Sequence, residues 1–277
     1  MNRTGGDMGQ ADYHYEPAGP DLADRVEAVW HLRHDGDEAP QFIAPDGACE
    51  IILHRATPPL ELRERRWTRQ DEAFLYGPLD RVLKLQQTGA MDVLGIRLRP
   101  WALGALGSRP ARWRNRAVPL AEIIGTGPAC ELLSHARQAA HPSAFWVSAA
   151  ALLDRTLPHS EALTAGRELV EVLESGAETK TAGLARRFGV TERTVSRRFE
   201  RACGLTARAM VRIVRFHHAR DAIKRGIDLV EVADMAGYAD QAHMTREFRH
   251  FAGITPVPAR QPAAYDVFYA QRNGNEM

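Results

Sequence analysis

The fold is decided by a stretch that the chain carries twice. Residues 184–206 read LARRFGVTERTVSRRFERACGLT, and residues 232–255 read VADMAGYADQAHMTREFRHFAGIT. The second copy starts 48 positions after the first and, after one inserted residue, continues 49 positions after it. Self-similarity of this kind indicates two copies of one supersecondary unit.

The first copy predicts two short helices separated by a tight turn. A helix over residues 181–188 ends at Gly189, which can adopt the left-handed conformation that redirects the chain. Thr191 then offers its side-chain oxygen to the free N–H groups of a second helix over 192–203. Val195 and Phe199 are four positions apart, so they share the face that packs on the first helix.

The second copy repeats this design. Gly237 makes the turn, and Asp240 or Ala239 lies near the cap of the following helix. Its inward positions are Met244, Phe248 and Phe251. The two helix-turn-helix units are therefore expected over about residues 181–203 and 229–251. A connecting helix over 209–224 would be about 24 Å long at roughly 1.5 Å per residue.

The outer faces of the two second helices predict contacts with double-stranded DNA. A helix-turn-helix places its second helix in the major groove, where Arg suits guanine and Gln suits adenine. The expected DNA-binding residues are Arg193, Thr194, Ser196, Arg197 and Arg198 in the first unit, and Gln241, Ala242, His243 and Arg246 in the second. A rigid connector could hold the two helices about one duplex turn apart, near ~34 Å.

The distribution of charge agrees with a polyanionic partner for this region. Residues 180–260 contain 16 Lys and Arg against 8 Asp and Glu, whereas residues 1–160 contain 18 against 20. A basic window joined to a slightly acidic half favours nucleic-acid binding by that window alone. A solvated helical surface rich in arginine would have the same composition, so the helix-turn-helix geometry decides between the two.

The repeated region resembles the DNA-binding domain of the AraC/XylS family of bacterial transcription regulators, over roughly residues 160–260. The match is carried by Gly189, Arg197 and Phe199 with Gly204-Leu205-Thr206, and by Ala236-Gly237-Tyr238, Met244, Phe248 and Gly253-Ile254-Thr255-Pro256. The resemblance implies base reading by Arg193, Ser196, Arg197, Gln241, Ala242, His243 and Arg246. It also implies contact with RNA polymerase and regulation of transcription, with activation or repression left open.

Three positions depart from the family pattern. Met210 stands where the connecting helix usually has an aromatic residue, and its thioether should pack there. Pro258 should shorten or distort a final helix, because proline removes a donor and clashes in a helix interior. Ala242 cannot make a bidentate base contact, so the second unit is expected to read sequence more loosely, with a thymine methyl as one target.

The first half of the chain predicts an α+β arrangement. Strands are expected over 25–32, 49–54, 73–76, 82–87 and 91–99, as a small antiparallel sheet or barrel, after a mobile arm up to about residue 21. Helices are expected over 101–106, 120–124, 129–139 and 144–157. A boundary at 158–160 divides a sensing or dimerisation domain (1–159) from an all-α DNA-binding domain (160–277), each with its own core. Ser160 would cap a helix over 161–175.

The N-terminal half resembles a less characterised domain found in such regulators, and that resemblance names no ligand. Candidate effector-binding residues are Trp30, His31, Glu50, His54, Arg97 and Arg99. Trp30 and His31 are neighbours, so on a strand only one of them can line a pocket. Glu50 and His54 would lie about 13 Å apart along a strand, which makes them poor co-ligands of one metal. Arg97 and Arg99 could bind an anionic effector, and solvated arginines remain an equal alternative.

Other classes of function find little support in the sequence. The chain has no nucleophile, phosphate-loop or His-Glu-x-x-His pattern at diagnostic spacing, so we expect no enzyme, cofactor or metal. It has no signal-like segment and no apolar run of about 20 residues, so a cytoplasmic protein without membrane contact is expected. A small-molecule-binding interaction protein that no longer reads DNA is the alternative. The sequence leaves a homodimer open.

Overall fold

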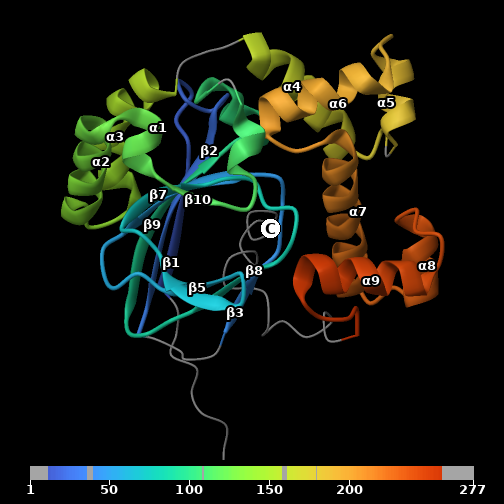
Figure 1. The fold of residues 1–277 in the computed structure, drawn as a ribbon, viewed down its shortest axis with the longest axis horizontal. Helices are drawn as coiled ribbons and strands as arrows, with labels where there is room; N and C mark the ends of the chain where they lie inside the picture. The colour runs from blue at the N-terminus through green and yellow to red at the C-terminus, as the bar shows by residue number, and fades with distance from the viewer. Residues whose placement is uncertain (1–11, 36–39, 108, 158–160, 179, 258–277) are drawn as a thin grey trace, which may run out of the picture.

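A computed structural model describes residues 12–35, 40–107, 109–157, 161–178 and 180–257 of the chain. It has the predicted α+β class: two antiparallel sheets and a set of helices in the first half, then an all-helical second half (Figure 1). Within the described residues, no helix is both long enough and apolar enough to cross a membrane.

The larger sheet has six strands, and each neighbouring pair is antiparallel. Their order is β1 (Asp12–Pro17), β2 (Val26–His34), β9 (Met91–Leu98), β4 (Cys49–His54), β7 (Ala73–Tyr76) and β10 (Ala117–Pro119). The smaller sheet has the order β3 (Gln41–Ile43), β8 (Leu83–Gln86), β5 (Leu60–Arg63) and β6 (Arg66–Arg69). The expected strands over 49–54 and 73–76 coincide with β4 and β7.

Successive side chains along a strand point to opposite faces of the larger sheet, and the two faces have different surroundings. Ile51 and Leu53 of β4 belong to the main hydrophobic cluster, together with Leu94 and Ile96 of β9. The intervening positions of β4 point to the other face, toward the smaller sheet, and include Glu50, Ile52 and His54. One face therefore supports the helices, and the other encloses a space between the sheets.

The first half also contains two 3-10 helices and three α-helices. They are η1 (Pro100–Ala105), η2 (Pro110–Trp113), α1 (Leu120–Ile124), α2 (Thr126–Gln138) and α3 (Pro142–Thr156). Helix α1 contacts β7, and α3 contacts β1 and β2. The helical segment expected over 101–106 thus forms η1, where Pro100 opens the first turn because its fixed φ suits that position.

The second half begins with α4 (Glu161–Glu174) and continues with two helix pairs joined by a long helix. The first pair is α5 (Thr181–Arg187) and α6 (Glu192–Cys203), and the second is α8 (Leu229–Met235) and α9 (Gln241–Ala252). Between them runs α7 (Ala207–Lys224), 18 residues long. Thr206 caps α7 by accepting a hydrogen bond from Ala209 N at 3.1 Å, so the helix begins two residues earlier than predicted.

The two halves pack against one another more closely than the sequence indicated. Their buried apolar residues form one continuous cluster rather than two separate cores. Helix η1 packs on both α4 and α6. At Gly104, a β-carbon would lie 2.6 Å from the carbonyl oxygen of Arg201, so the close approach of η1 to α6 requires glycine there.

The expected mobile arm is also wrong in the part that the structure describes. Residues 12–17 are not part of a mobile arm, because they form β1 and pair along their whole length with β2. Tyr13 stacks on Trp30 with a ring-centroid distance of 6.2 Å, which adds side-chain contact to the main-chain pairing. Met210 is fully buried, as its predicted packing role requires. The proposed cap at Ser160, the boundary at 158–160, the effect of Pro258 and the arm before residue 12 lie outside the described residues.

We predict that Glu247→Gln lowers the free energy of unfolding by about 1–2 kcal/mol at neutral pH, because Glu247 accepts two charge-assisted hydrogen bonds from the partly exposed Arg212. Burial acts to raise the pKa of Glu247, but the Arg212 guanidinium outweighs it and the pKa is lowered. The contribution is therefore present above the unfolded pKa near ~4.3 and is lost as the pH falls through the folded pKa.

Urea unfolding at neutral pH and near pH 3 would measure this difference. Glu231→Gln is the matched control, because Glu231 is exposed at the start of α8. If the Glu247→Gln and Glu231→Gln variants have the same free energy of unfolding at neutral pH, the Arg212–Glu247 ion pair does not stabilise the fold.

Candidate nucleic-acid interface and cavity

The first helix-turn-helix unit holds α6 through a small set of local contacts. The turn after α5 places Gly189 at φ +62°, in the left-handed region. Thr191 Oγ1 accepts a hydrogen bond from Thr194 N at 3.1 Å and so caps α6. Val195 and Phe199 are fully buried on the face that packs against α5. Because these buried side chains fix the rotation of α6 about its axis, they also determine which residues of α6 face outward.

The second unit is built in the same way. Gly237 has φ +73°, and Asp240 Oδ1 accepts a hydrogen bond from His243 N at 2.6 Å, so Asp240 is the cap. Phe248 is fully buried and lies 4.9 Å from Phe216 of α7, ring centroid to ring centroid, in an edge-to-face arrangement. These contacts lock α9 onto the connecting helix.

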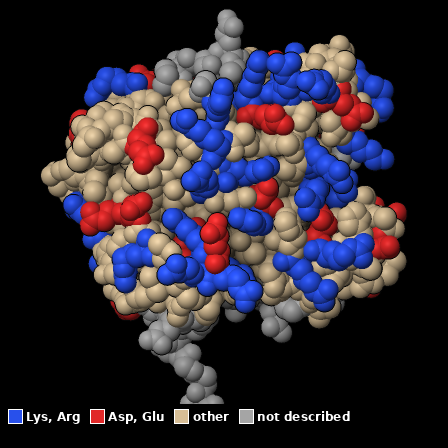
Figure 2. Space-filling model, viewed as in Figure 1, with Lys and Arg blue, Asp and Glu red and all other residues tan. Residues whose placement is uncertain are grey.

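The expected DNA-binding residues all lie on the outer surfaces of α6 and α9 or at their margins. Exposed side chains are Arg193 and Arg197 on α6 and Gln241, Ala242 and Arg246 on α9. Half-buried side chains are Thr194, Ser196, Arg198 and His243. Figure 2 shows Lys and Arg side chains over this part of the molecule, with fewer Asp and Glu among them. Each second helix therefore presents polar groups of the types that read base edges.

A basic cleft separates the two units, and sequence reasoning missed it. It has a volume of about 640 Å³. Its lining residues come from α7, from both units and from the residue before α5, and its basic members are Lys180, Arg208, Arg212, Arg215 and His243. Arg212 is committed to Glu247, with two N···O distances of 2.8 Å. The helical spacing of Arg208, Arg212 and Arg215, at three or four residues, was visible in the sequence and could have revealed this face.

A second candidate site lies between the two sheets of the N-terminal half. This cavity measures about 90 Å³, several times the roughly 10–15 Å³ that one water needs. Its walls are mainly apolar and include Trp30, Ile52, Phe74, Leu83, Leu85, Met91 and Val93. Trp30 fits because it lies over Gly95, where a β-carbon would be 2.1 Å from the Trp30 ring.

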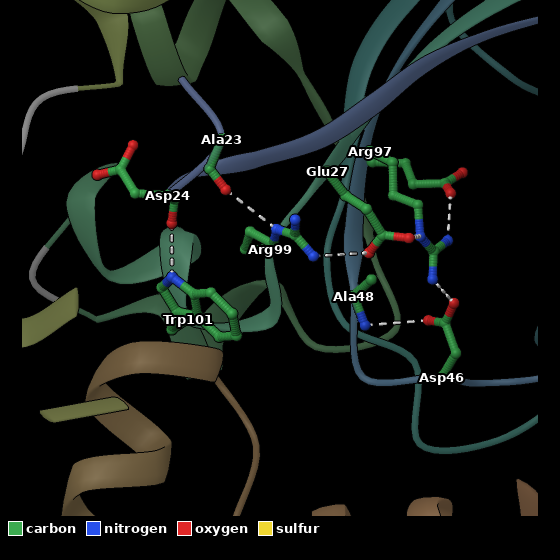
Figure 3. A network of polar contacts seen from close by, with 9 residues as sticks. Ala23, Asp24, Glu27, Asp46, Ala48, Arg97, Arg99 and Trp101 are labelled. Atoms are coloured by element: carbon green, nitrogen blue, oxygen red, sulfur yellow. Dashed lines mark hydrogen bonds and ion pairs between the residues drawn. The ribbon is translucent and has the colours of Figure 1, made fainter. Parts of the chain in front are cut away.

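Three carboxylates surround one half-buried arginine (Figure 3), which lines one end of the cavity. Arg97 Nη1 donates to Glu50 Oε1 at 2.8 Å, its Nη2 donates to Asp46, and its Nε lies 3.3 Å from Glu27. Burial raises the pKa of the Glu50 carboxyl, although the charge of Arg97 acts to lower it. Carboxylates outnumber guanidinium groups here, because Glu27, Asp46 and Glu50 meet Arg97 and, at 3.9 Å from Glu27, Arg99.

The other end of the cavity is ordered by a chain of hydrogen bonds to Glu61, whose charge is paired with Arg63 at 2.8 Å. Gln70 Nε2 donates to Glu61, so Gln70 Oε1 is left to accept from His54 Nε2 at 3.3 Å. Tyr76 also donates to Glu61, at 2.7 Å. Burial lowers the pKa of His54 to about 4, so its ring is neutral at pH 7. The remaining nitrogen of the ring, Nδ1, is therefore an acceptor.

The structure brings four of the six candidate effector residues to this cavity: Trp30, Glu50, His54 and Arg97. His31 lies on the opposite face of the sheet, where its Nε2 is 2.8 Å from Asp92. Arg99 donates to the carbonyl oxygen of Ala23 and pairs with Glu27 at 3.9 Å, away from the cavity (Figure 3). Sequence reasoning missed Asp46, Gln70, Tyr76 and Gln87, which also line it.

Two loops at the rim of the cavity touch the helical half directly. His217 Nε2 of α7 donates to the carbonyl oxygen of Pro45 at 2.8 Å, next to Asp46 of the arginine cluster. His250 Nε2 of α9 donates to the carbonyl oxygen of Asp80 at 2.8 Å, and Val82 N donates to His250 O at 3.2 Å. The loop segments that line the cavity thus also hold α7 and α9. Among the described residues, no group of three His, Cys, Asp or Glu side chains is arranged to hold a metal ion.

Comparison with known proteins agrees with the helical geometry. Residues 184–261 match a family described as a helix-turn-helix domain, and residues 13–119 match a domain of unknown function, DUF6597. No curated protein matches the chain.

Three solved structures show weak similarity. ToxT from Vibrio cholerae is 9 % identical with a TM-score of 0.43, over 90 % of this chain and 97 % of ToxT. The AraC-like transcriptional activator CuxR is 14 % identical with a TM-score of 0.34, over 76 % and 87 %. The C-terminal domain of AraT, a response regulator from Geobacillus stearothermophilus, is 16 % identical with a TM-score of 0.34, over 39 % and 93 %.

These structural likenesses are too weak to assign any residue a role. The type of domain is assigned instead from the matched helix-turn-helix family and from the two capped units that one helix joins. Residues 184–261 of the chain therefore carry a helix-turn-helix domain made of two capped units, the arrangement that the resemblance to AraC/XylS regulators implied.

Proposed function

We propose that the chain binds a specific double-stranded DNA site through both units at once and that a small molecule in the N-terminal cavity adjusts this binding. The main support for DNA binding by both units is that one helix, α7, joins them. Their outer faces expose Arg193 and Arg197 on α6 and Arg246 on α9. Base reading is assigned to Arg193, Ser196, Arg197, Gln241, His243 and Arg246, with Thr194 and Arg198 at the margins of the contact. Ala242 meets only apolar base edges.

The basic cleft complements these base-reading helices. Where one protein enters two successive major grooves, the sugar-phosphate backbones that border the minor groove between them pass across the connector. Arg208 of α7 is exposed at this cleft, and Lys180 lines it on the side of the first unit. Their charges would neutralise phosphates and hold the duplex in register without reading its sequence.

The proposed response to a small molecule follows from the shared loops. Asp46 and Leu83 line the cavity, while their neighbours Pro45 and Val82 bond to α7 and α9. A ligand that moves either loop would therefore change the contacts that hold α7 and α9 against the N-terminal half, and with them the placement of both units on DNA. RNA polymerase contact follows from the family resemblance and is part of the same proposal, which leaves a homodimer open.

In vitro selection of duplexes with the full chain tests DNA reading. We expect enrichment of a motif with two half-sites, G·C-rich where α6 binds and more permissive where α9 binds. A selection that enriches no sequence, in the presence or absence of small molecules, would favour an interaction protein that no longer reads DNA.

We predict that Arg246→Ala weakens binding to the selected site by about 1–3 kcal/mol and relaxes preference at one base position, because Arg246 reads a base edge. Fluorescence anisotropy on the selected site and on single-base variants would measure both effects. Arg249→Ala is the matched control, since Arg249 is exposed near the opposite end of α9. Equal affinities of the Arg246→Ala variant and the parent would remove Arg246 from the base contacts.

Arg208→Gln should weaken DNA binding without changing sequence preference, unlike Arg246→Ala. Loss of one phosphate contact weakens binding to all sequences about equally and lowers the slope of log K against log salt by about 0.9. A salt titration of anisotropy would give the slope for the parent and the variant. An unchanged slope would place Arg208 outside the interface.

We also predict that DNA binding changes amide hydrogen exchange in the two rim loops, residues 44–48 and 77–82, because coupling between two sites is reciprocal. His217→Ala should reduce the change at 44–48, since it removes the bond to Pro45. His218→Ala is the control, because His218 is exposed on the same helix. Loops with the same exchange in free and DNA-bound protein would contradict the coupling.

A further inference from the structure

The polar groups that line the N-terminal cavity favour a ligand that donates hydrogen bonds. Three of the donors around it are already engaged, because Arg97, Tyr76 and Gln70 all donate to carboxylates. Gln87, only 2 % exposed, lines the cavity, and its side-chain oxygen has no hydrogen-bond partner among the described residues. A buried acceptor without a donor costs about 1–3 kcal/mol, so a ligand N–H or O–H at Gln87 would be stabilised.

The acceptors lie at two ends of the cavity. The strand register pairs Leu60 with Gln86, and its continuation puts Gln87 beside Pro59, next to Gln70 and the His54 end. Glu50 lies four residues from His54 on the same strand, about 13 Å away along its axis. Apolar and aromatic side chains fill the wall between the two ends.

The sign of charge at the Glu50 end selects among ligands. Asp46, Glu27 and Glu50 surround the single guanidinium of Arg97, and Arg99 reaches Glu27 only at 3.9 Å. Glu50 keeps 24 % of its side chain exposed and lines the cavity. A bound carboxylate would meet an excess of negative charge and an arginine already satisfied, whereas a bound cation would restore balance.

We propose that the cavity binds a small aromatic or cycloalkyl amine, with its ammonium group at Glu50 and Asp46 and its apolar body along Trp30, Phe74 and Met91. A donor group on the far side of the ligand would hydrogen-bond to Gln87. This assignment rests on the proposed small-molecule response and names its ligand class. It replaces the anionic effector that Arg97 and Arg99 suggested in the sequence.

Isothermal titration calorimetry with matched probes tests this assignment. The probes are 2-phenylethylamine, tryptamine and cyclohexylamine, each compared with the carboxylic acid and the alcohol of the same shape. At least one amine should bind at neutral pH, and its acid should bind about 10- to 100-fold more weakly. An acid that binds as tightly as its amine, or a complete absence of amine binding up to the solubility limit, would overturn the proposal.

Two variants locate the site. Glu50→Gln should weaken amine binding about 10- to 100-fold and leave binding of the neutral alcohol nearly unchanged. Glu122→Gln, on the exposed surface of α1, is the control and should bind like the parent. If Glu50→Gln leaves amine affinity at the parental value, the ammonium group does not lie at Glu50.

The Gln87→Met variant distinguishes a role of Gln87 in ligand binding from a role in folding stability. It removes the unpartnered oxygen, so the melting temperature of the free protein should rise while affinity for donor-bearing amines falls. A variant with a lower melting temperature and unchanged amine affinity would contradict a ligand role for Gln87.

Anisotropy on the selected DNA separates this proposal from the proposed function. An amine that binds the cavity without changing DNA affinity would remove the small-molecule response and leave the ligand class intact. An acid that binds instead of the amine and changes DNA affinity would overturn the ligand class and leave the response intact.

Discussion

The burial of α7 is the constraint on which the rest of the structure depends. This helix is held by the fully buried Met210, Ile213 and Phe216, and it packs against α5 and α6 at one end and α8 and α9 at the other. Its 18 residues span about 27 Å at roughly 1.5 Å per residue. A helix so enclosed cannot bend without loss of packing, so it sets the distance and rotation between the two DNA-facing helices.

The same helix connects the DNA-facing surface to the cavity between the sheets. His217 lies on the half of α7 that faces the loop at Pro45, and Met210 lies so close to this loop that a β-carbon at Gly47 would be 2.6 Å from its methyl group. The loop itself is anchored to Arg97 through Asp46. A continuous set of packed and hydrogen-bonded groups therefore runs from Glu50 through Arg97, Asp46 and Pro45 to α7.

Local signals in the sequence predicted much of the fold. Left-handed glycines, cap residues and four-residue apolar spacing predicted α5, α6, α8 and α9, because each of these features acts within one turn of a helix. Apolar runs such as Cys49–His54 predicted the central strands. The short or polar strands were missed: all four residues of β6 are exposed, so this strand carries no apolar alternation.

Contacts between distant residues could not be predicted in the same way. Glu50 and Arg97 were both candidates for an effector site, but their mutual pairing and the addition of Glu27 and Asp46 depend on strand register. The sequence therefore left an anion site and solvated arginines as equal alternatives for Arg97 and Arg99, whereas the strand register places three carboxylates around Arg97. The bonds from His217 and His250 to the N-terminal loops were likewise invisible, because each donor meets a backbone carbonyl more than 160 positions away.

A series of duplexes with altered half-site spacing tests the rigid connector most directly. Binding of the full chain to the selected site would be measured by anisotropy as base pairs are inserted between the half-sites. Insertion of about 5 base pairs turns one half-site to the opposite face of the duplex. A rigid α7 predicts that affinity then falls to that of a single half-site. Equal affinity at both spacings would contradict a connector that fixes the two units one duplex turn apart.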